Sequence, residues 1–89
     1  MKIKAEIKEE ITTKVISKLT ETVPKSFYTI NSWIQEDKPQ SKTTDFVVEL
    51  CLVLGKKIGE VYEDLEPNYE NAINDFLAAR AKRDQKPNQ

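Results

Sequence analysis

Short hydrogen-bonding side chains gather between residues 26 and 35. The uncharged polar residues of this run are Ser26, Tyr28, Thr29, Asn31, Ser32 and Gln35. Hydroxyl and amide groups donate and accept hydrogen bonds without carrying charge, which suits contact with the edges of DNA bases. A helix face that only meets water normally shows Lys and Glu instead. The run therefore predicts a DNA-reading helix, and the alternative is an ordinary solvated helix face.

The apolar residues of the same run are spaced as on one side of a helix. These residues are Phe27, Ile30, Trp33 and Ile34, three and four positions apart. We expect Ile30 and Trp33 to lie in the core, whereas Phe27 fits the core and the reading face equally well. Ser26 can cap the start of this helix, which is predicted to run to about Glu36.

The residues before this helix also show helical spacing. Apolar side chains recur mostly every fourth residue at Ile3, Ile7, Ile11, Val15, Ile16 and Leu19. One long helix or two would fit. We favour a short helix near residues 3–10 and a second near 12–21, because Thr12 and Thr13 offer a helix start. Pro24 disfavours helical geometry at Val23, so the chain is expected to turn there.

A polar loop and a strongly apolar segment follow the run. Residues 37–42 are polar and include Pro39, which predicts a loop. Residues 46–54 are apolar at eight of nine positions, which suits a buried strand or a buried helix. We predict a helix because Thr43 or Thr44 can cap its start and Gly55 can end it. Such a helix would form the centre of the core.

The last third of the chain predicts two more helices. Residues 58–65 place Ile58, Val61, Tyr62 and Leu65 at helical spacing. Pro67 suits the first position of a helix over residues 67–83, followed by a frayed tail from Asp84. The apolar residues of this last helix are Tyr69, Ile73, Phe76 and Leu77. They either close over the core or form a dimer surface, and we favour the dimer surface.

These elements predict an all-α fold of five or six helices. Residues 1–65 would form the principal domain, and residues 66–89 would add a C-terminal helix and tail. A chain of 89 residues has a marginal core, so dimerisation would be a natural supplement. No apolar run approaches the roughly 18 residues of a membrane span, and the N-terminus lacks the apolar core of a signal peptide. We therefore expect a cytoplasmic protein that does not bind a membrane.

The composition argues against an enzyme. The chain has no histidine and one cysteine, which excludes His/Cys zinc sites and acid–base catalysis by histidine. Cys51 lies in the apolar segment, so we expect a buried thiol. No Gly-rich phosphate loop is present, and the carboxylates between residues 60 and 70 lack calcium-loop spacing. We predict no catalytic residues, no cofactor and no metal.

Charge is unevenly distributed along the chain. The net charge of −1 is unusual for a nucleic-acid-binding protein. Residues 1–42 nevertheless hold 8 Lys and 6 acidic residues, whereas residues 43–70 hold 2 Lys and 7 acidic residues. Lys25, Lys38 and Lys42 flank the reading run and are candidate phosphate contacts, with ordinary surface lysines as the alternative. The acidic block supports a second interpretation, a helical protein–protein adaptor.

Three stretches, in this order, resemble a known family. They are Ile30-Asn31-Ser32-Trp33, then Glu36-Asp37-Lys38-Pro39, then the apolar run from Phe46 that continues through Leu54-Gly55 to Tyr62. Together they resemble the lambda-repressor-like, Cro-like helix-turn-helix domains of phage and bacterial regulators. The turn departs from the family pattern. It is about three residues too long if Ser17 fills the small-residue position of the first helix, and Pro24 takes the glycine slot if Thr20 does.

The resemblance implies a transcriptional regulator that binds double-stranded DNA as a homodimer. Six residues would then face the major groove: Ser26, Phe27, Tyr28, Asn31, Ser32 and Gln35. Asn31 and Gln35 would pair with adenine edges, and Tyr28 or Phe27 would touch a thymine methyl group. Lys25, Lys38 and Lys42 would contact phosphates. In this family, a C-terminal extension such as residues 66–89 often pairs subunits.

Overall fold

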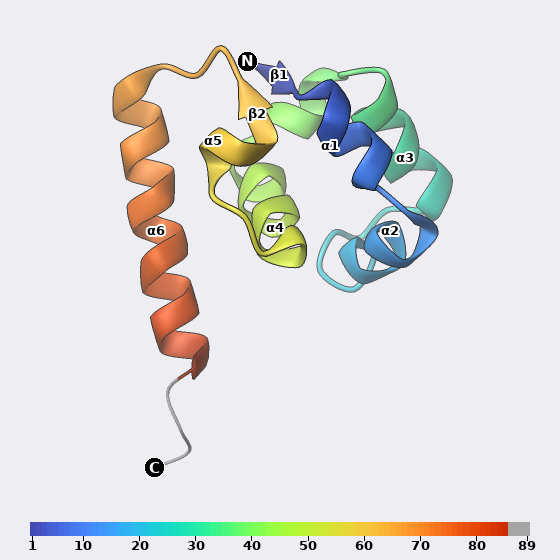
Figure 1. Cartoon of the computed structure of the whole chain (residues 1–89). Helices are drawn as coiled ribbons and strands as arrows, with labels where there is room; N and C mark the ends of the chain where they lie inside the picture. Colours follow the sequence, from blue (N-terminus) through green and yellow to red (C-terminus); the bar gives the residue numbers. More distant parts are fainter. Residues whose placement is uncertain (86–89) are drawn as a thin grey trace.

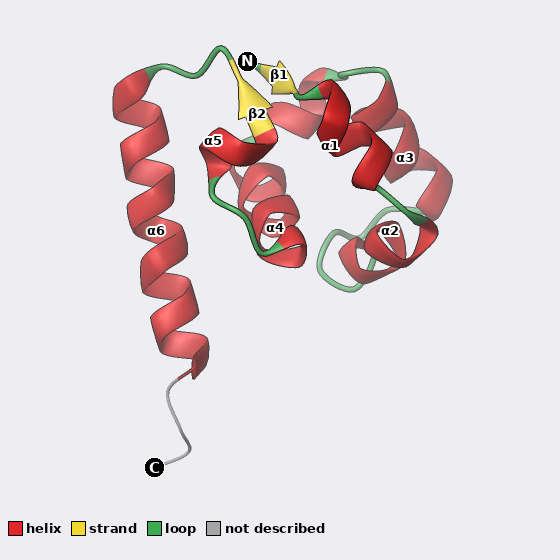
Figure 2. Ribbon diagram, in the orientation of Figure 1, coloured by secondary structure: helices red, strands yellow, loops and turns green. Residues whose placement is uncertain are grey.

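The computed structural model describes residues 1–85 as a largely helical structure (Figures 1 and 2). In chain order the elements are β1 (Lys2–Ile3), α1 (Ala5–Glu10), α2 (Thr13–Leu19), α3 (Phe27–Gln35), the 3-10 helix η1 (Pro39–Lys42), α4 (Thr44–Leu54), α5 (Ile58–Val61), β2 (Tyr62–Glu63) and α6 (Pro67–Gln85). The prediction of a helical fold is confirmed for this part of the chain. The predicted loop over residues 37–42 contains one short helical turn.

A small antiparallel sheet of two strands accompanies the helices. Lys2 pairs with Glu63 and Ile3 with Tyr62, and the Lys4 N–H donates to the Val61 carbonyl at 2.9 Å. The helix predicted over residues 58–65 therefore ends at Val61. Two-residue strands are too short to show an alternating pattern, so this pairing could not be predicted from local sequence.

Residues 5–19 contain two helices, as favoured from the sequence, although the first begins at Ala5 because Ile3 belongs to β1. Thr12 has extended geometry, with φ −94° and ψ 171°, and its hydroxyl oxygen accepts the Val15 N–H at 3.4 Å. This is N-cap geometry, so Thr12 separates α1 from α2. Ile7 of α1 and both Ile16 and Leu19 of α2 are buried, which fastens each helix to the core.

Helix α4 is the centre of the core, and it contacts α2, η1, α5 and α6. Val47 and Leu50 are fully buried. Gly55 ends the helix with a left-handed φ of 67°, a conformation that glycine adopts without steric cost. The start differs from prediction in one detail. Thr43 occupies the N-cap position, but its hydroxyl donates backwards to the Gln40 carbonyl at 3.1 Å instead of accepting from the helix.

Helix α6 packs against one side of the domain, along α4 and α5 (Figure 1). Ile73 is buried, and Tyr69 and Leu77 are partly buried against the core. Phe76 stays 51% exposed. Three of the four predicted apolar side chains therefore close over the core, which was one of the two alternatives for this helix. The fourth, Phe76, faces outward.

Candidate nucleic-acid interface

Helix α3 begins at the predicted cap. The Ser26 hydroxyl oxygen accepts the Thr29 N–H at 3.2 Å, and Ser26 lies in extended geometry immediately before the helix. The same hydroxyl donates to Thr29 Oγ1 at 3.0 Å. A short polar side chain at this position satisfies a backbone N–H that has no partner within the helix. Both hydroxyls at the start of α3 are therefore already engaged with one another.

The apolar side of α3 packs on the core. Ile30 and Ile34 are fully buried. Trp33 is half-buried and packs edge to face against Phe46 of α4, with ring centroids 5.8 Å apart and an interplanar angle of 68°. The expectation of a core position is confirmed for Ile30, whereas Trp33 lies at the edge of the core. These contacts fix the rotation of α3 and thereby determine which side chains face solvent.

The outward face of α3 carries four of the predicted reading residues. Tyr28, Asn31, Ser32 and Gln35 are three and four positions apart, so they share one side of the helix. Tyr28 is 83% exposed, Gln35 is exposed, and the other two are half-buried. No charged residue occurs within α3. The outward face is consequently a continuous uncharged surface of hydroxyl and amide groups.

Phe27 lies between its two predicted roles. Its ring packs against the edge of the core and is half-buried. It also meets the Tyr28 ring edge to face, with centroids 5.7 Å apart and an interplanar angle of 77°. Phe27 therefore packs between the core and the exposed ring of Tyr28.

A shallow depression of about 340 Å³ lies between α3 and η1. Its lining includes the predicted residues Tyr28, Ser32 and Lys38, together with Thr29 and Gln40. Gln40 was not among the predicted site residues, because a polar loop has no periodicity that assigns a side chain to a face. Pro39 at the start of η1 is the one local signal for the helical turn that brings Gln40 here.

Ser32, Glu36 and Lys38 form an exposed polar network beside this depression. The Ser32 hydroxyl donates to Glu36 Oε2 at 2.9 Å, and Lys38 Nζ lies 3.5 Å from Glu36 Oε1. The hydrogen bond from Ser32, followed by the charge and hydrogen bond of Lys38, lowers the pKa of Glu36. The carboxylate is therefore ionised at neutral pH and offsets part of the positive charge of Lys38. Because the Ser32 hydroxyl donates its hydrogen to Glu36, Ser32 can only accept further hydrogen bonds.

Asp37 fastens the end of α3 to the N-terminal segment. Lys8 Nζ donates to Asp37 Oδ2 at 2.6 Å and to the Gln35 carbonyl at 3.2 Å, while the Ile3 N–H donates to Asp37 Oδ1 at 3.3 Å. Burial acts to raise the pKa of Asp37, but the hydrogen bonds from Lys8 and Ile3 and the charges of Lys8 and Lys42 outweigh it, so the pKa is lowered. This network orients the turn that leads into η1, and sequence reasoning did not identify it.

The three predicted phosphate-binding lysines lie at both ends of α3. Lys25 is exposed just before its N-terminus, Lys38 is exposed after its C-terminus, and Lys42 is half-buried at the end of η1. Among the side chains that the structure describes, in residues 1–82, neither Lys25 nor Lys42 forms an ion pair, whereas Lys38 pairs with Glu36. Positive charge therefore flanks the uncharged face at both ends, and at the C-terminal end the negative charge of Glu36 accompanies it.

The connection between α2 and α3 is long for a helix-turn-helix. It spans residues 20–26, compared with a usual turn of about three or four residues. Thr20 is the C-cap of α2, so it does not lie inside that helix. Ser17 lies within α2. Backbone bonds from Val23 N–H to the Leu19 carbonyl (2.8 Å) and from Lys25 N–H to the Val23 carbonyl (2.7 Å) order the extra residues.

Comparison with known proteins gives no further assignment, since the chain matches no family model, no curated protein and no solved structure at a significant level. Within residues 1–85, no helix combines the length and apolar character needed to cross a membrane. Among residues 1–82, whose side chains are described, there is no cluster of three or more His, Cys, Asp or Glu side chains able to hold a metal ion.

Proposed function

We propose that this protein is a sequence-specific regulator that binds double-stranded DNA and places α3 in the major groove. The observation that carries the proposal is the uncharged outward face of α3, formed by Tyr28, Asn31, Ser32 and Gln35. The helix presenting this face is anchored through the buried side chains of Ile30 and Ile34. A rigid helix with exposed amides and hydroxyls matches the donor and acceptor pattern of base edges in that groove.

Each predicted contact has a distinct chemical role in this proposal. The Asn31 and Gln35 amides present a donor and an acceptor together, which suits the N6 and N7 edge of adenine. Tyr28 offers an exposed ring for a thymine methyl group, with Phe27 behind it. Ser26 lies at the N-terminal end of the face, and Ser32 can accept a hydrogen bond from a base amino group.

Phosphates would be contacted at the two ends of the reading face. Lys25 stands at the N-terminus of α3, where the helix dipole also favours an anion. Lys38 and Lys42 would contact the backbone on the other side of the groove, and Gln40 lies beside Lys38 at the depression. Such contacts position the protein on DNA, whereas the amides of α3 select the sequence.

We further propose that the regulator acts as a homodimer that occupies its operator. A dimer places two reading helices in successive major grooves about 34 Å apart, which matches one turn of DNA. Phe76 is a large apolar residue of α6 whose ring remains exposed, and it lines a cleft of about 450 Å³ between α4 and α6. Burial of this ring against a second copy would remove apolar surface from water.

Selection of bound sites from a random DNA pool, followed by a salt titration on the recovered site, tests the proposed function. We expect a recurring, roughly palindromic site and an affinity that falls as salt increases, with a shallow slope because few lysines flank the face. Recovery of no preferred sequence, together with no binding to duplex DNA at low salt, contradicts the proposal.

Absence of DNA binding would favour the alternative function, a helical adaptor that binds another protein. Its support is the acidic block over residues 43–70, which holds 7 acidic residues against 2 lysines. Asp45 and Glu49 of this block line the cleft between α4 and α6; Arg80 Nη1 of the same cleft lies 3.8 Å from Glu49 Oε2, so Asp45 is the exposed carboxylate there. Such a surface would suit a basic partner segment.

A further inference from the structure

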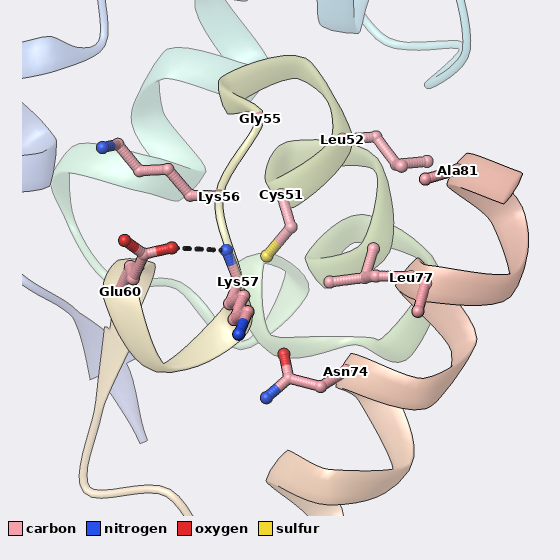
Figure 3. Close-up of a pocket in the computed structure, with 10 residues that line it drawn as sticks. Cys51, Leu52, Gly55, Lys56, Lys57, Glu60, Asn74, Leu77 and Ala81 are labelled. Carbon is pink, nitrogen blue, oxygen red and sulfur yellow. Dashed lines mark hydrogen bonds between the residues drawn. The ribbon is translucent and has the colours of Figure 1, made fainter. Parts of the chain in front are cut away.

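A second cleft lies on the other side of α6, where this helix meets the end of α4 and α5 (Figure 3). Its volume is about 510 Å³, which falls within the range of about 300–1,000 Å³ typical of small-molecule sites. Leu52 of α4 and Leu77, Ala78 and Ala81 of α6 form its apolar walls. These walls and the reading face of α3 belong to separate parts of the fold.

The floor of the cleft is uncharged. Cys51 is 1% exposed, and Figure 3 shows its sulfur between α4 and the segment that leads into α5. Burial, with a smaller effect from the charge of Glu60, raises the pKa of the Cys51 thiol to about 12. The thiol is therefore protonated at neutral pH and acts as a small apolar group. A ligand tail in this cleft would meet sulfur and aliphatic carbon.

The mouth of the cleft presents hydrogen-bond donors. The Asn74 side-chain oxygen accepts the Ile58 N–H at 3.2 Å, so its amide nitrogen is left to donate elsewhere. The Lys57 ammonium is exposed and forms no ion pair within the described residues. Glu60 also lines the mouth, where its Oε1 accepts the Lys57 N–H at 2.9 Å (Figure 3) and its negative charge offsets part of the positive charge of Lys57.

Lys56, the other cation at the mouth, is less available to bind a ligand. Lys56 Nζ lies 3.9 Å from Glu10 Oε1, and Figure 3 shows its side chain directed away from α6. The ammonium of Lys57 and the amide of Asn74 are thus the groups free to bind a ligand. Both are hydrogen-bond donors and Lys57 is cationic, so a carboxylate group can bind to this pair.

We propose that this cleft binds a small amphipathic carboxylate. Its apolar tail lies along Leu52 and Leu77, and its carboxylate accepts hydrogen bonds from Lys57 and Asn74. This site does not rest on the proposed DNA-binding function. Failure to bind DNA and failure to bind a carboxylate are measured separately.

Titration of the full-length ¹⁵N-labelled protein, followed by amide NMR spectra, tests the site. The probes are octanoate, octan-1-ol and octylammonium, which share a chain and differ in charge at the head. We expect octanoate to cause saturable shifts at millimolar concentration in the amides that line the cleft. Octanol should bind more weakly and octylammonium not at all. Equal binding of all three probes, or shifts spread over the whole surface, would overturn the proposal.

Two pairs of variants locate the ligand. Lys57→Gln should weaken octanoate binding about two- to fivefold, the size expected for an exposed ion pair, whereas Lys18→Gln on α2 should not change it. Ala78→Phe fills the cleft and should abolish saturable binding, whereas Ala79→Phe, next to it on α6 and outside the cleft, should retain it. Leu52→Trp fills the same cleft from α4 and replaces Ala78→Phe if that variant does not fold. Unchanged binding in a folded cleft-filling variant contradicts the site.

Discussion

The Trp33 ring meets the Phe46 ring edge to face, with centroids 5.8 Å apart, and this contact joins the candidate reading helix α3 to the central helix α4. Phe46 is 3% exposed, so the contact reaches from the protein surface into the core. It holds one side of α3 inward while Tyr28 and its neighbours face outward. The orientation of the candidate interface therefore depends on core packing.

Loss of the Trp33 ring should destabilise the fold. Trp33→Ala removes a half-buried aromatic ring and its contact with Phe46, and we expect a loss of about 2–3 kcal/mol in the free energy of unfolding. Urea unfolding followed by circular dichroism measures this. Tyr28→Ala is the matched control, because that ring is 83% exposed, and it should change stability by less than about 0.5 kcal/mol. Equal effects of the two substitutions would contradict the packing described here.

The Lys8–Asp37 pair should make stability depend on pH in the acid range. The pKa of Asp37 is lowered from its ordinary value of 3.8, so the folded state favours the ionised form. That contribution is fully present above pH 3.8 and is lost as the pH falls through the folded pKa below it.

Asp37→Asn should therefore reduce stability by about 1–2 kcal/mol at pH 7, in line with loss of a charge-assisted hydrogen bond at a partly exposed site. The difference from the wild-type chain should shrink in the window below pH 3.8. Unfolding curves recorded across this range give the measurement. Lys18→Met, which removes an exposed charge elsewhere, should leave the profile unchanged. A constant difference at all pH values would argue that Asp37 acts through shape alone.

Removal of the Glu36 charge should strengthen DNA binding. Glu36 is ionised beside Lys38 and lies at the end of the reading face, where it opposes the approach of phosphate. Glu36→Gln should raise the affinity for the selected site about threefold at low salt, with less gain at high salt because the effect is electrostatic. Glu9→Gln on α1 is the control. Fluorescence anisotropy at several salt concentrations measures both, and weaker binding by Glu36→Gln would contradict the proposed approach of DNA.

Replacement of Phe76 should separate the subunits. In the described part of the chain, Tyr28 and Phe76 are the two large hydrophobic side chains that remain exposed, and they lie on different helices. Phe76→Ser should shift the chain from dimer to monomer in sedimentation equilibrium without loss of helix content, whereas Tyr28→Ser should leave the dimer intact. A wild-type chain that sediments as a monomer would remove the proposed role of α6.

Local signals predicted most of the helices correctly. The Ser26 cap, the Thr12 cap and the Gly55 stop each act through backbone geometry within a few residues, so the sequence shows them directly. The helical spacing of Ile30 and Ile34 likewise determined the buried side of α3. Helix α6 was predicted over residues 67–83 and extends to Gln85, so the first two residues of the predicted tail are helical, and the rest of that tail lies outside the described residues.

Contacts between distant residues could not be predicted in the same way. The pairing of Lys2 with Glu63 and the ion pair of Lys8 with Asp37 depend on the completed fold. Tyr62 illustrates the difficulty: its spacing suits a helix, yet it lies in β2, buried, and its hydroxyl donates to the Ser41 carbonyl at 2.7 Å. Tertiary packing overrides local propensity at such a position. The cleft beside Cys51 could not be predicted for the same reason, since its lining residues come from α4, α5 and α6, which meet only in the completed fold.

Binding of the Asn31→Ala variant to the selected DNA site is the most direct test of the reading face. Asn71→Ala, the same change at an exposed position of α6, is the matched control. We expect Asn31→Ala to weaken specific binding at least about tenfold, as loss of a bidentate base contact requires, while its thermal unfolding and its nonspecific binding stay unchanged. Gln35→Ala should behave in the same way. Wild-type affinity in both folded variants would contradict the account.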